Sequence, residues 1–257
     1  MSFRHILGLA GVFAAFAASA QSDSAATATA VPETAPAEVA PLTEAHGPAT
    51  PGDAARGESK AAACAACHSV DGNSVDPQYP KIAGQHERYI ARQLALFKSG
   101  ERANPIMLGF AATLSPQDMR DLGAFFSAKT IQAGLADDSV VSDGEFQGQK
   151  FYSAGERLYR GGDLERNIPA CAACHSATGS GNPGPAYPRL GGQHAGYTAT
   201  QLTAFRDGAV WGAGENANAV MSGVAKHLTD AEIASLASYI EGLHAAAHGS
   251  SGTAGSK

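Results

Sequence analysis

The sequence predicts an all-α protein built from two tandem domains of similar fold. At 257 residues, the chain exceeds the size of most single domains. Its apolar residues recur at helical spacing, and no run of β-branched residues indicates a strand. Motifs of the first half also return, in the same order, in the second half. Length, periodicity and repetition thus agree on two helical domains.

The repeat extends well beyond a single motif. Residues 79–86, YPKIAGQH, match residues 187–194, YPRLGGQH, at an offset of 108. At the same offset, Tyr89, Gln93, Leu94 and Phe97 pair with Tyr197, Gln201, Leu202 and Phe205. After six additional residues in the second copy, Met107, Leu114 and Ser115 pair with Met221, Leu228 and Thr229. An internal duplication with one domain per copy accounts for this pattern.

Composition predicts where each segment begins and ends. Residues 1–20 have a polar start, an apolar run and the small-residue ending Ala18-Ser19-Ala20, which predicts a cleaved signal peptide. Residues 21–51 are almost all Ala, Thr, Pro, Ser and Glu, which predicts a disordered leader. We expect a first domain at 52–132, an acidic linker at 133–145, a second domain at 146–247 and a disordered tail at 248–257.

The signal peptide predicts an exported, periplasmic protein. Its apolar run is shorter than the roughly 20 residues that a spanning helix needs, and no other stretch of the chain approaches that length. Peripheral attachment to a membrane stays open. The net charge of −6 at pH 7 argues against a nucleic-acid partner, because such binding calls for basic patches.

Each copy is expected to end in an amphipathic helix with a recognisable start. Ser115-Pro116 and Asp118 provide an N-cap, a proline at the first helical position and an acidic first turn. Thr229 and Glu232 have the spacing of a capping box. Apolar residues follow both starts at helical spacing. The sequence therefore predicts two terminal helices, each with an apolar face.

These apolar faces need partners, and the helix before each cysteine pair is the expected one. Gly57 and Gly155 lie where a close helix crossing would favour a residue without a side chain. An ordinary loop or cap glycine is an equally good interpretation of either position.

The four cysteines define the chemistry. All of them fall in two copies of one pentapeptide, CAACH, at residues 64–68 and 171–175. This C-x-x-C-H pattern is typical of covalent haem attachment. Two thiols three positions apart can reach the two vinyl groups of one haem, and the next histidine can bind the iron. The sequence predicts two covalently bound haem c groups, held by Cys64, Cys67, Cys171 and Cys174.

Three other interpretations of the cysteines fit less well. A thioredoxin-like C-x-x-C would need a surrounding βαβ pattern, whereas both flanks are rich in alanine. A single zinc site would have to combine two pairs that lie 107 residues apart. A disulfide within each pair would be strained and would leave the two histidines unexplained.

His68 and His175 are the predicted axial ligands on one side of each iron. On the other side, Met107 and Met221 are the leading candidates, because they occupy equivalent positions eight residues before each terminal N-cap. Met119 has no methionine counterpart and is assigned to the core.

The competing sixth ligands are His86 and His194, which are also equivalent in the repeat. They lie at the expected start of a helix, where an exposed polar residue is ordinary. We expect His46, His227, His244 and His248, which have no repeat partner, to lie on the surface. The carbonyls of Pro80 and Pro188 are candidates to accept the Nδ1–H of the two axial histidines, although both prolines also fit simple turns.

These motifs together resemble the dihaem cytochrome c4 family. The resemblance covers about residues 52–244 and rests on CAACH, YPKIAGQ, YPRLGGQ, the two methionines and the terminal helices. It implies two class I cytochrome c domains, His/Met ligation by His68 with Met107 and by His175 with Met221, and closely spaced haems. The long leader departs from the family pattern.

The resemblance implies a periplasmic electron carrier that delivers electrons toward a membrane terminal oxidase. We expect an upstream quinol-oxidising complex or another donor as its second partner. An iron with a methionine at its sixth position has no open site for a substrate, which favours transfer over catalysis.

Two further classes of function stay open. The first is a dihaem enzyme, such as a peroxidase or a thiosulfate-oxidising enzyme, and the second is a haem subunit of a larger complex. Residues 207–219, which hold the six-residue insertion and Trp211, distinguish the second copy from the first. We interpret this segment as a surface loop.

Overall fold

Helices form the regular structure of the computed structural model, which describes residues 50–214 and 217–245. All described residues belong to one unit, residues 39–257. Between the helices, the described residues form isolated β-bridges and no strand. The predicted all-α fold is therefore confirmed. The signal peptide, the leader as far as residue 49, and the tail lie outside the described residues, as do His46 and His248.

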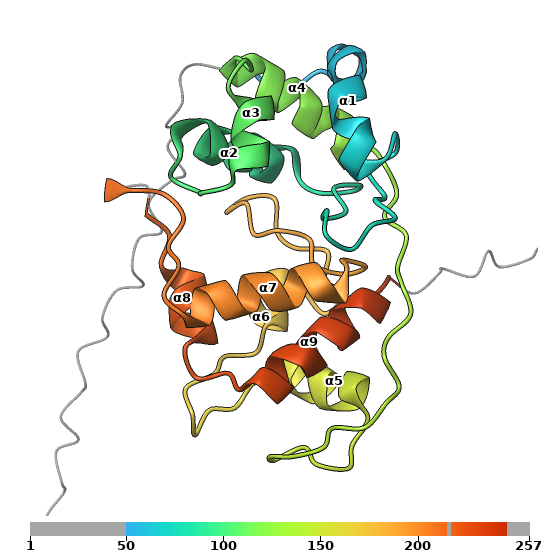
Figure 1. Ribbon diagram of the computed structural model, residues 1–257, viewed down its shortest axis with the longest axis vertical. Helices are drawn as coiled ribbons and strands as arrows, with labels where there is room; N and C mark the ends of the chain where they lie inside the picture. The colour runs from blue at the N-terminus through green and yellow to red at the C-terminus, as the bar shows by residue number, and fades with distance from the viewer. Residues whose placement is uncertain (1–49, 215–216, 246–257) are drawn as a thin grey trace, which may run out of the picture. The chain divides into compact units, whose positions relative to one another are not determined.

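The first four helices form one group, coloured blue to green in Figure 1. They are α1 (Ala54–His68), α2 (Glu87–Ser99), α3 (Pro105–Ala111) and α4 (Pro116–Ser127). The later helices form a second group, coloured yellow to red. They are α5 (Phe151–Gly161), α6 (Ala172–His175), α7 (Ala195–Arg206), α8 (Val220–Ala225) and α9 (Asp230–Gly242).

Both terminal helices begin where the caps predict. The Ser115 side chain accepts a hydrogen bond from the backbone N–H of Asp118, and the Asp118 carboxylate accepts one from the backbone of Ser115. Thr229 and Glu232 form the same reciprocal pair at the start of α9. Each capping box satisfies two backbone donors that the first turn of a helix leaves unpaired. The predicted starts of α4 and α9 are confirmed.

The terminal helices pack on the helices that the sequence assigned to them, α4 on α1 and α9 on α5. A Cβ atom added at Gly57 would lie 2.1 Å from the backbone oxygen of Asp121. One added at Gly155 would lie 2.0 Å from the backbone oxygen of Ser235. Both glycines therefore lie at close helix crossings, which decides between the two interpretations that the sequence left open.

Each group of helices encloses its own apolar core. Met119 belongs to the first core, as predicted. The other buried members of the first core are Ala61, Ile90, Leu94, Ala95, Phe97, Ala111, Leu122, Phe125 and Phe126. The buried members of the second core are Val141, Phe146, Ala154, Leu158, Tyr159, Ile168, Phe205, Ala225, Leu228, Ile233, Leu236, Ile240 and Leu243. Burial of one large apolar side chain stabilises a fold by about 1.5–3 kcal/mol, so these cores dominate the energetics of both domains.

The segment predicted as a linker, residues 133–145, makes contacts along α9. The Gly134 N–H donates to the backbone oxygen of Glu241 at 3.0 Å, and the Asp137 N–H donates to Ser238 Oγ at 2.9 Å. Val141 is buried in the second core. The segment is thus attached to the second domain along much of its length. In the described part of the chain, no helix is long and apolar enough to cross a membrane.

Candidate haem sites

The two C-x-x-C-H motifs lie at the ends of helices. In the first domain, Cys64, Cys67 and His68 occupy the last turns of α1. In the second, Cys174 and His175 lie in the single turn of α6, and Cys171 is the residue before it. All four cysteines have at least partial exposure. Each motif thus presents two thiols and one imidazole from a single turn.

Both histidines of these motifs are oriented by a proline carbonyl. His68 Nδ1 lies 2.8 Å from the Pro80 oxygen, and His175 Nδ1 lies 2.9 Å from the Pro188 oxygen. Because a carbonyl can only accept, each Nδ1 carries the proton and each Nε2 keeps its lone pair. The carbonyl contacts predicted for Pro80 and Pro188 are confirmed.

The surroundings of His68 and His175 favour the form that binds a metal. Both side chains are buried. Burial lowers the pKa of each imidazole, against the opposing effect of the proline carbonyl. A neutral imidazole with a proton on Nδ1 is the form that ligates iron through Nε2. The residues present therefore fit a haem iron.

A pair of glycines fixes the loop that supplies these carbonyls. Gly84 has φ +66° and Gly192 has φ +85°, in the left-handed region that side chains rarely adopt. Their N–H groups donate to the backbone oxygens of Phe126 and Ile240, at 2.8 and 2.9 Å. The loop is thereby tied to the end of α4 or α9. The repeated glycine of YPKIAGQH and YPRLGGQH thus has a structural reason.

The predicted methionine ligands lie on the short helices α3 and α8. Met107 follows the N-cap Asn104, whose side chain accepts a hydrogen bond from the Met107 N–H at 3.0 Å. Met107 is partly buried against the first core, and so is Cys64. Met221 is partly buried against the second core, and so is Cys171. Each domain thus has a methionine and a cysteine of the predicted attachment motif in contact with the same apolar core.

The thiols that lie against these cores are held in the protonated form. Burial raises the pKa of the Cys64 thiol. It raises the pKa of Cys171 to about 11. A thiol with a high pKa is less nucleophilic than an ordinary one.

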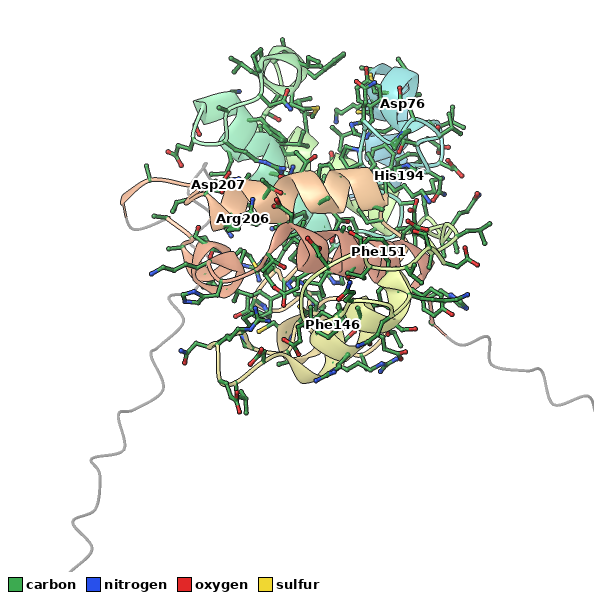
Figure 2. The ribbon with its side chains drawn as sticks, turned by 60° about the horizontal axis from the view of Figure 1, so that its bottom comes forward. Asp76, Phe146, Phe151, His194, Arg206 and Asp207 are labelled. Atoms are coloured by element: carbon green, nitrogen blue, oxygen red, sulfur yellow. The ribbon has the colours of Figure 1, made fainter. Side chains whose placement is uncertain are left out.

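His194 is not the exposed residue that the sequence suggested. It is the N-cap of α7 (Figure 2) and only 8% exposed. Its Nε2 lies 3.0 Å from Ser74 Oγ and 2.9 Å from the Ser74 backbone oxygen, in the first domain. Its Nδ1 lies 3.5 Å from Glu241 Oε1. The expectation of an exposed residue was wrong because a segment of the other domain covers the start of α7.

The equivalent His86 has a different environment. It is partly buried at the start of α2 and lies against the backbone of Ser180. Its buried Nε2 has no hydrogen-bond partner among the described residues. Burial lowers the pKa of its imidazole. By contrast, His227 and His244 are exposed, as predicted.

Two glutamines, which the sequence analysis missed, join the domains reciprocally. Gln193 Oε1 accepts from the Lys81 N–H at 2.9 Å, and Gln193 Nε2 donates to the Lys81 oxygen at 2.8 Å. Gln85 does the same with Arg189, at 2.9 and 3.0 Å. The signal that could have found this contact is the GQH triplet, which the repeat preserves in both copies.

Trp211 lies in a largely exposed loop, as the sequence predicted for residues 207–219, and it also takes part in the contact between the domains. Its ring lies 4.7 Å from the Phe205 ring, and the Arg102 guanidinium lies 3.7 Å from its centre. Arg102 belongs to the first domain, yet it also donates to Tyr197 and Gln201 of the second, at 2.9 Å each. The insertion supplies a cation–π partner for this arginine.

The helical fold, with two cysteine-histidine turns on separate cores, defines a c-type cytochrome with two haem sites. A family model described as cytochrome c matches the chain twice, at residues 54–128 and 148–244. Cytochrome c4 of Azotobacter vinelandii is 45% identical over 202 residues, covering 75% of this chain and 90% of the relative. Cytochrome c4 of Pseudomonas aeruginosa is 43% identical over 193 residues, with the same coverage.

Solved structures agree with these relatives. The crystal structure of reduced recombinant cytochrome c4 from Pseudomonas stutzeri is similar to this chain with a TM-score of 0.67 and 42% identity. The match covers 75% of this chain and all of that one. A more distant relative, 36% identical over 180 residues, is the thiosulfate dehydrogenase electron acceptor of Stutzerimonas stutzeri, with coverage of 70% of this chain and 78% of the relative.

The chain belongs to the cytochrome c4 family. It is a dihaem c-type electron carrier with two covalently bound haem c groups, and it works with redox partners. The family consists of electron-transfer proteins, so the dihaem enzyme considered from the sequence is not favoured. The predicted family, fold and cofactors are confirmed. The individual ligands, the domain boundaries and the particular partners stay predictions.

Proposed function

We propose that the chain is a periplasmic carrier that passes electrons from a quinol-oxidising complex to a terminal cytochrome c oxidase. The observation that carries this proposal is the equivalence of the two sites. In each domain a histidine held by a proline carbonyl follows the cysteine pair, and one of these cysteines contacts the same apolar core as the methionine. A bound haem supplies an iron that takes up and releases one electron. The residues around it hold its ligands fixed, so that little rearrangement accompanies the transfer.

In this proposal Cys64 and Cys67 attach the first haem, and Cys171 and Cys174 attach the second. His68 and His175 bind the irons through Nε2, the nitrogen that the proline contacts leave with a lone pair. Exchange of Cys174 for Ala should impair attachment only in the second domain. Mass spectrometry of the denatured protein measures the haem count, because thioethers survive unfolding. A wild-type mass with one haem, or with none, would contradict the proposal.

Met107 and Met221 are the proposed sixth ligands. Both methionines lie against apolar cores, whereas both ring nitrogens of His194 are engaged by Ser74 and Glu241. A methionine ligand favours Fe(II) and raises the reduction potential, which suits a carrier that feeds an oxidase.

The matched substitutions Met107→His and Met221→His test this ligation. Imidazole is a harder and more basic donor than thioether sulfur, so each substitution should lower the potential of one haem only. The far-red absorption of Met–Fe(III) should fall by about half in each single variant and vanish in the double. Met119→Leu, in the first core, is the control and should change neither band nor potential. Unchanged spectra in both Met→His variants, with a perturbed first haem in His86→Ala, would favour histidine ligation instead.

The proposed oxidase partner is tested by its kinetics. The chain carries a net charge of −6, so docking guided by local charge should weaken as salt screens it. We expect membranes that contain a cytochrome c oxidase to oxidise the reduced protein rapidly at low ionic strength and more slowly at high ionic strength. Absorbance of the reduced haem follows the reaction. Failure of these membranes to oxidise the protein would overturn the oxidase assignment.

A second candidate donor is an exported dehydrogenase. The similarity to a thiosulfate dehydrogenase electron acceptor favours it, since that relative is named for receiving electrons from such an enzyme. Reduction of the oxidised protein by a thiosulfate dehydrogenase, compared with reduction by a quinol-oxidising complex, decides between the two donors. Export itself is tested by N-terminal sequencing of the protein from a periplasmic fraction, where we expect Gln21 as the first residue.

A further inference from the structure

The peptide group between Pro80 and Lys81 is hydrogen-bonded at both of its polar ends. Its carbonyl accepts from His68 Nδ1 at 2.8 Å. Its N–H, which belongs to Lys81, donates to Gln193 Oε1 at 2.9 Å. His68 and the peptide belong to the first domain, whereas Gln193 belongs to the second. A single peptide group thus links the proposed iron ligand of one domain to a side chain of the other.

The same arrangement occurs in the opposite direction. The carbonyl between Pro188 and Arg189 accepts from His175 Nδ1 at 2.9 Å, and the N–H of this peptide donates to Gln85 Oε1 at 2.9 Å. Gln85 comes from the first domain. The contact between the domains is therefore crosswise, with each domain holding the peptide that orients the other domain's histidine.

Both glutamines are fixed by further hydrogen bonds. Each Nε2 donates to the next carbonyl of the opposite chain segment, that of Lys81 or Arg189. Each Oε1 also accepts from the following N–H of its own chain, at 3.0 Å to His194 or His86. Gln85 and Gln193 are each only 7% exposed. An amide with this many buried partners has little freedom to rotate away.

A hydrogen bond at the N–H of an amide increases the negative charge on its oxygen. In condensed phases such cooperativity strengthens the next bond by roughly 10–30%. A stronger acceptor for Nδ1–H makes the imidazole a more basic ligand. A more basic ligand favours Fe(III) over Fe(II) and lowers the reduction potential. The chain of effects runs from the glutamine, through one peptide group, to the histidine.

We propose that Gln193 tunes the potential of the first haem and Gln85 that of the second, as positioning residues that act across the contact between the domains. The proposal rests on the axial roles of His68 and His175 proposed above. The potential of each haem then depends on contact with the other domain, so that any partner that loosens this contact raises the potential of both haems.

The test compares Gln193→Leu with Gln85→Leu. Leucine has a similar volume but cannot accept from the peptide N–H. In Gln193→Leu we expect the potential of the first haem to rise while that of the second stays near the wild-type value. Gln85→Leu should give the opposite pattern. NMR signals of the haem methyl groups, followed through a redox titration, assign each potential to its domain.

A second readout monitors the histidine itself. In the reduced protein, the ¹H and ¹⁵N resonances of the His68 Nδ1–H group should move in Gln193→Leu, in the direction of a weaker hydrogen bond. Those of His175 should stay in place. The control Arg102→Met removes polar contacts between the domains at a place away from both peptides. It should not produce the crosswise pattern. If Gln193→Leu does not fold, Gln193→Asn, whose shorter side chain cannot reach Lys81, gives the same comparison.

The outcomes separate this proposal from the one on which it rests. If the far-red Met–Fe(III) band is intact but neither potential moves, or both move equally, the crosswise tuning is wrong and the ligation stands. A shift confined to the glutamine's own domain also overturns the tuning. If the Met→His variants show that the ligation differs, or if His68→Ala leaves the first iron unchanged, the proposed ligand set fails independently of these glutamines.

Discussion

The two domains carry the same cysteine-histidine motif on different supports. In the first domain the motif is the end of one continuous helix, α1, and Cys64 lies seven positions after Gly57. In the second domain Cys171 lies sixteen positions after Gly155, and α5 ends at Gly161 before the motif begins. The intervening loop packs Ile168 into the second core. Both domains thus place the same cysteine-histidine motif beside a proline carbonyl, although the backbone segments that precede the motif differ.

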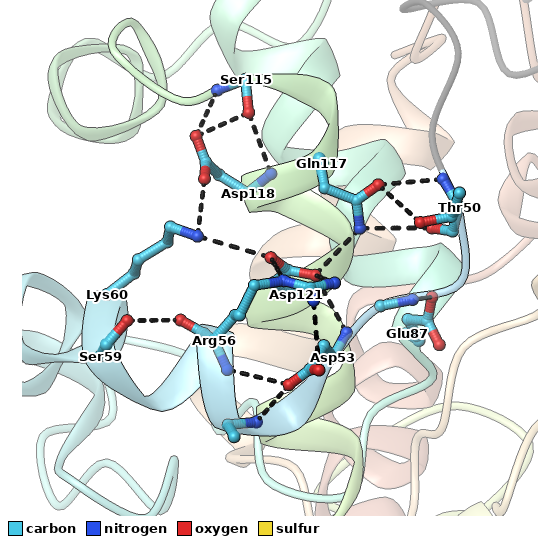
Figure 3. A network of polar contacts seen from close by, with 12 residues as sticks. Thr50, Asp53, Arg56, Ser59, Lys60, Glu87, Ser115, Gln117, Asp118 and Asp121 are labelled. Atoms are coloured by element: carbon cyan, nitrogen blue, oxygen red, sulfur yellow. Dashed lines mark hydrogen bonds and ion pairs between the residues drawn. The ribbon is translucent and has the colours of Figure 1, made fainter.

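The buried charges differ as well. In the first domain the side chain of Asp121 is only 1% exposed and lies against α1. Its carboxylate forms ion pairs with Arg56 and Lys60 (Figure 3). It also accepts a hydrogen bond from the backbone N–H of Asp53. Ser235 occupies the equivalent place in the second domain, and its hydroxyl donates to Ala231 of its own helix.

The second domain places its buried carboxylate elsewhere. Glu232 caps α9 and pairs with Arg166, which comes from the loop that the first domain lacks. Arg166 is in turn held by Asp163 at 2.6 Å. The proline carbonyl that contacts each proposed axial histidine is therefore kept in both domains. The residues that stabilise the surrounding helices differ, and their effects on the two domains should be separable by mutation.

The largest expected effect is at the helix crossings that both domains share. Gly57→Ala should destabilise the first domain, and Gly155→Ala the second, by about 3 kcal/mol each, because the new Cβ would overlap a backbone oxygen and separate the helices. Hydrogen exchange of amides in α4 and α9 reports each domain separately. Gly161→Ala, where no atom lies within 4 Å of the new Cβ, is the control and should be nearly neutral. Equal losses at all three positions would refute the crossing argument.

The next effect should be confined to the second domain. Arg166→Leu removes the cation that faces buried Glu232, and we expect a loss of about 2 kcal/mol in the stability of that domain. The Thr229 N–H still donates to the Glu232 carboxylate, which limits the loss. Denaturant unfolding followed by exchange of the α9 amides measures it. A comparable loss of exchange protection in the α4 amides would show that the stabilities of the two domains are not independent.

Asp121→Ser transfers the second domain's residue to the first. We expect a loss of about 1–2 kcal/mol at pH 7, since Arg56 is half exposed and its ion pair is partly screened. Arg56 holds the pKa of Asp121 far below its usual range. A depressed pKa in the folded state stabilises the fold above the unfolded value, about 3.9, and this contribution is lost as the pH falls toward the folded value.

The difference between wild type and Asp121→Ser should therefore shrink on acidification below about pH 4. Asp118 also stabilises the fold more at neutral than at acidic pH, because Lys60 lowers its pKa to about 2. Both proteins contain Asp118, so it does not contribute to the difference between them. Thermal unfolding from pH 7 to pH 2 measures the difference. A gap that stays constant over this range would mean that the Asp121 carboxylate contributes nothing through its charge.

The smallest expected change in stability concerns the residues that precede α1 of the first domain. Thr50 contacts Gln117 through its N–H and hydroxyl, at 2.9 and 3.0 Å, but these contacts are exposed. Deletion of residues 21–49, with the predicted signal peptide of residues 1–20 kept for export, should leave both haem spectra intact, and Thr50→Ala should cost less than about 0.5 kcal/mol. Spectra and melting of the truncated protein check this. Loss of either haem signal would place the boundary of the first domain before residue 50.

Much of the local structure could be predicted from the sequence. Ser115 and Thr229 start the terminal helices, because a cap and its third residue interact over a single turn. The carbonyls of Pro80 and Pro188 were candidates to contact the proposed axial histidines, and the structure shows both contacts.

The sequence by itself determined the all-α class, the family and the haem-binding motifs, because these depend on residue types at short, fixed spacings. Only the tertiary structure decided that His194 is buried, that Trp211 packs on Arg102, and that Gln85 and Gln193 bind across the domains. A histidine or tryptophan in a loop has the same sequence signal whether water or another domain covers it. Burial and hydrogen-bond partners of such residues depend on segments about 100 positions away, which local periodicity cannot report.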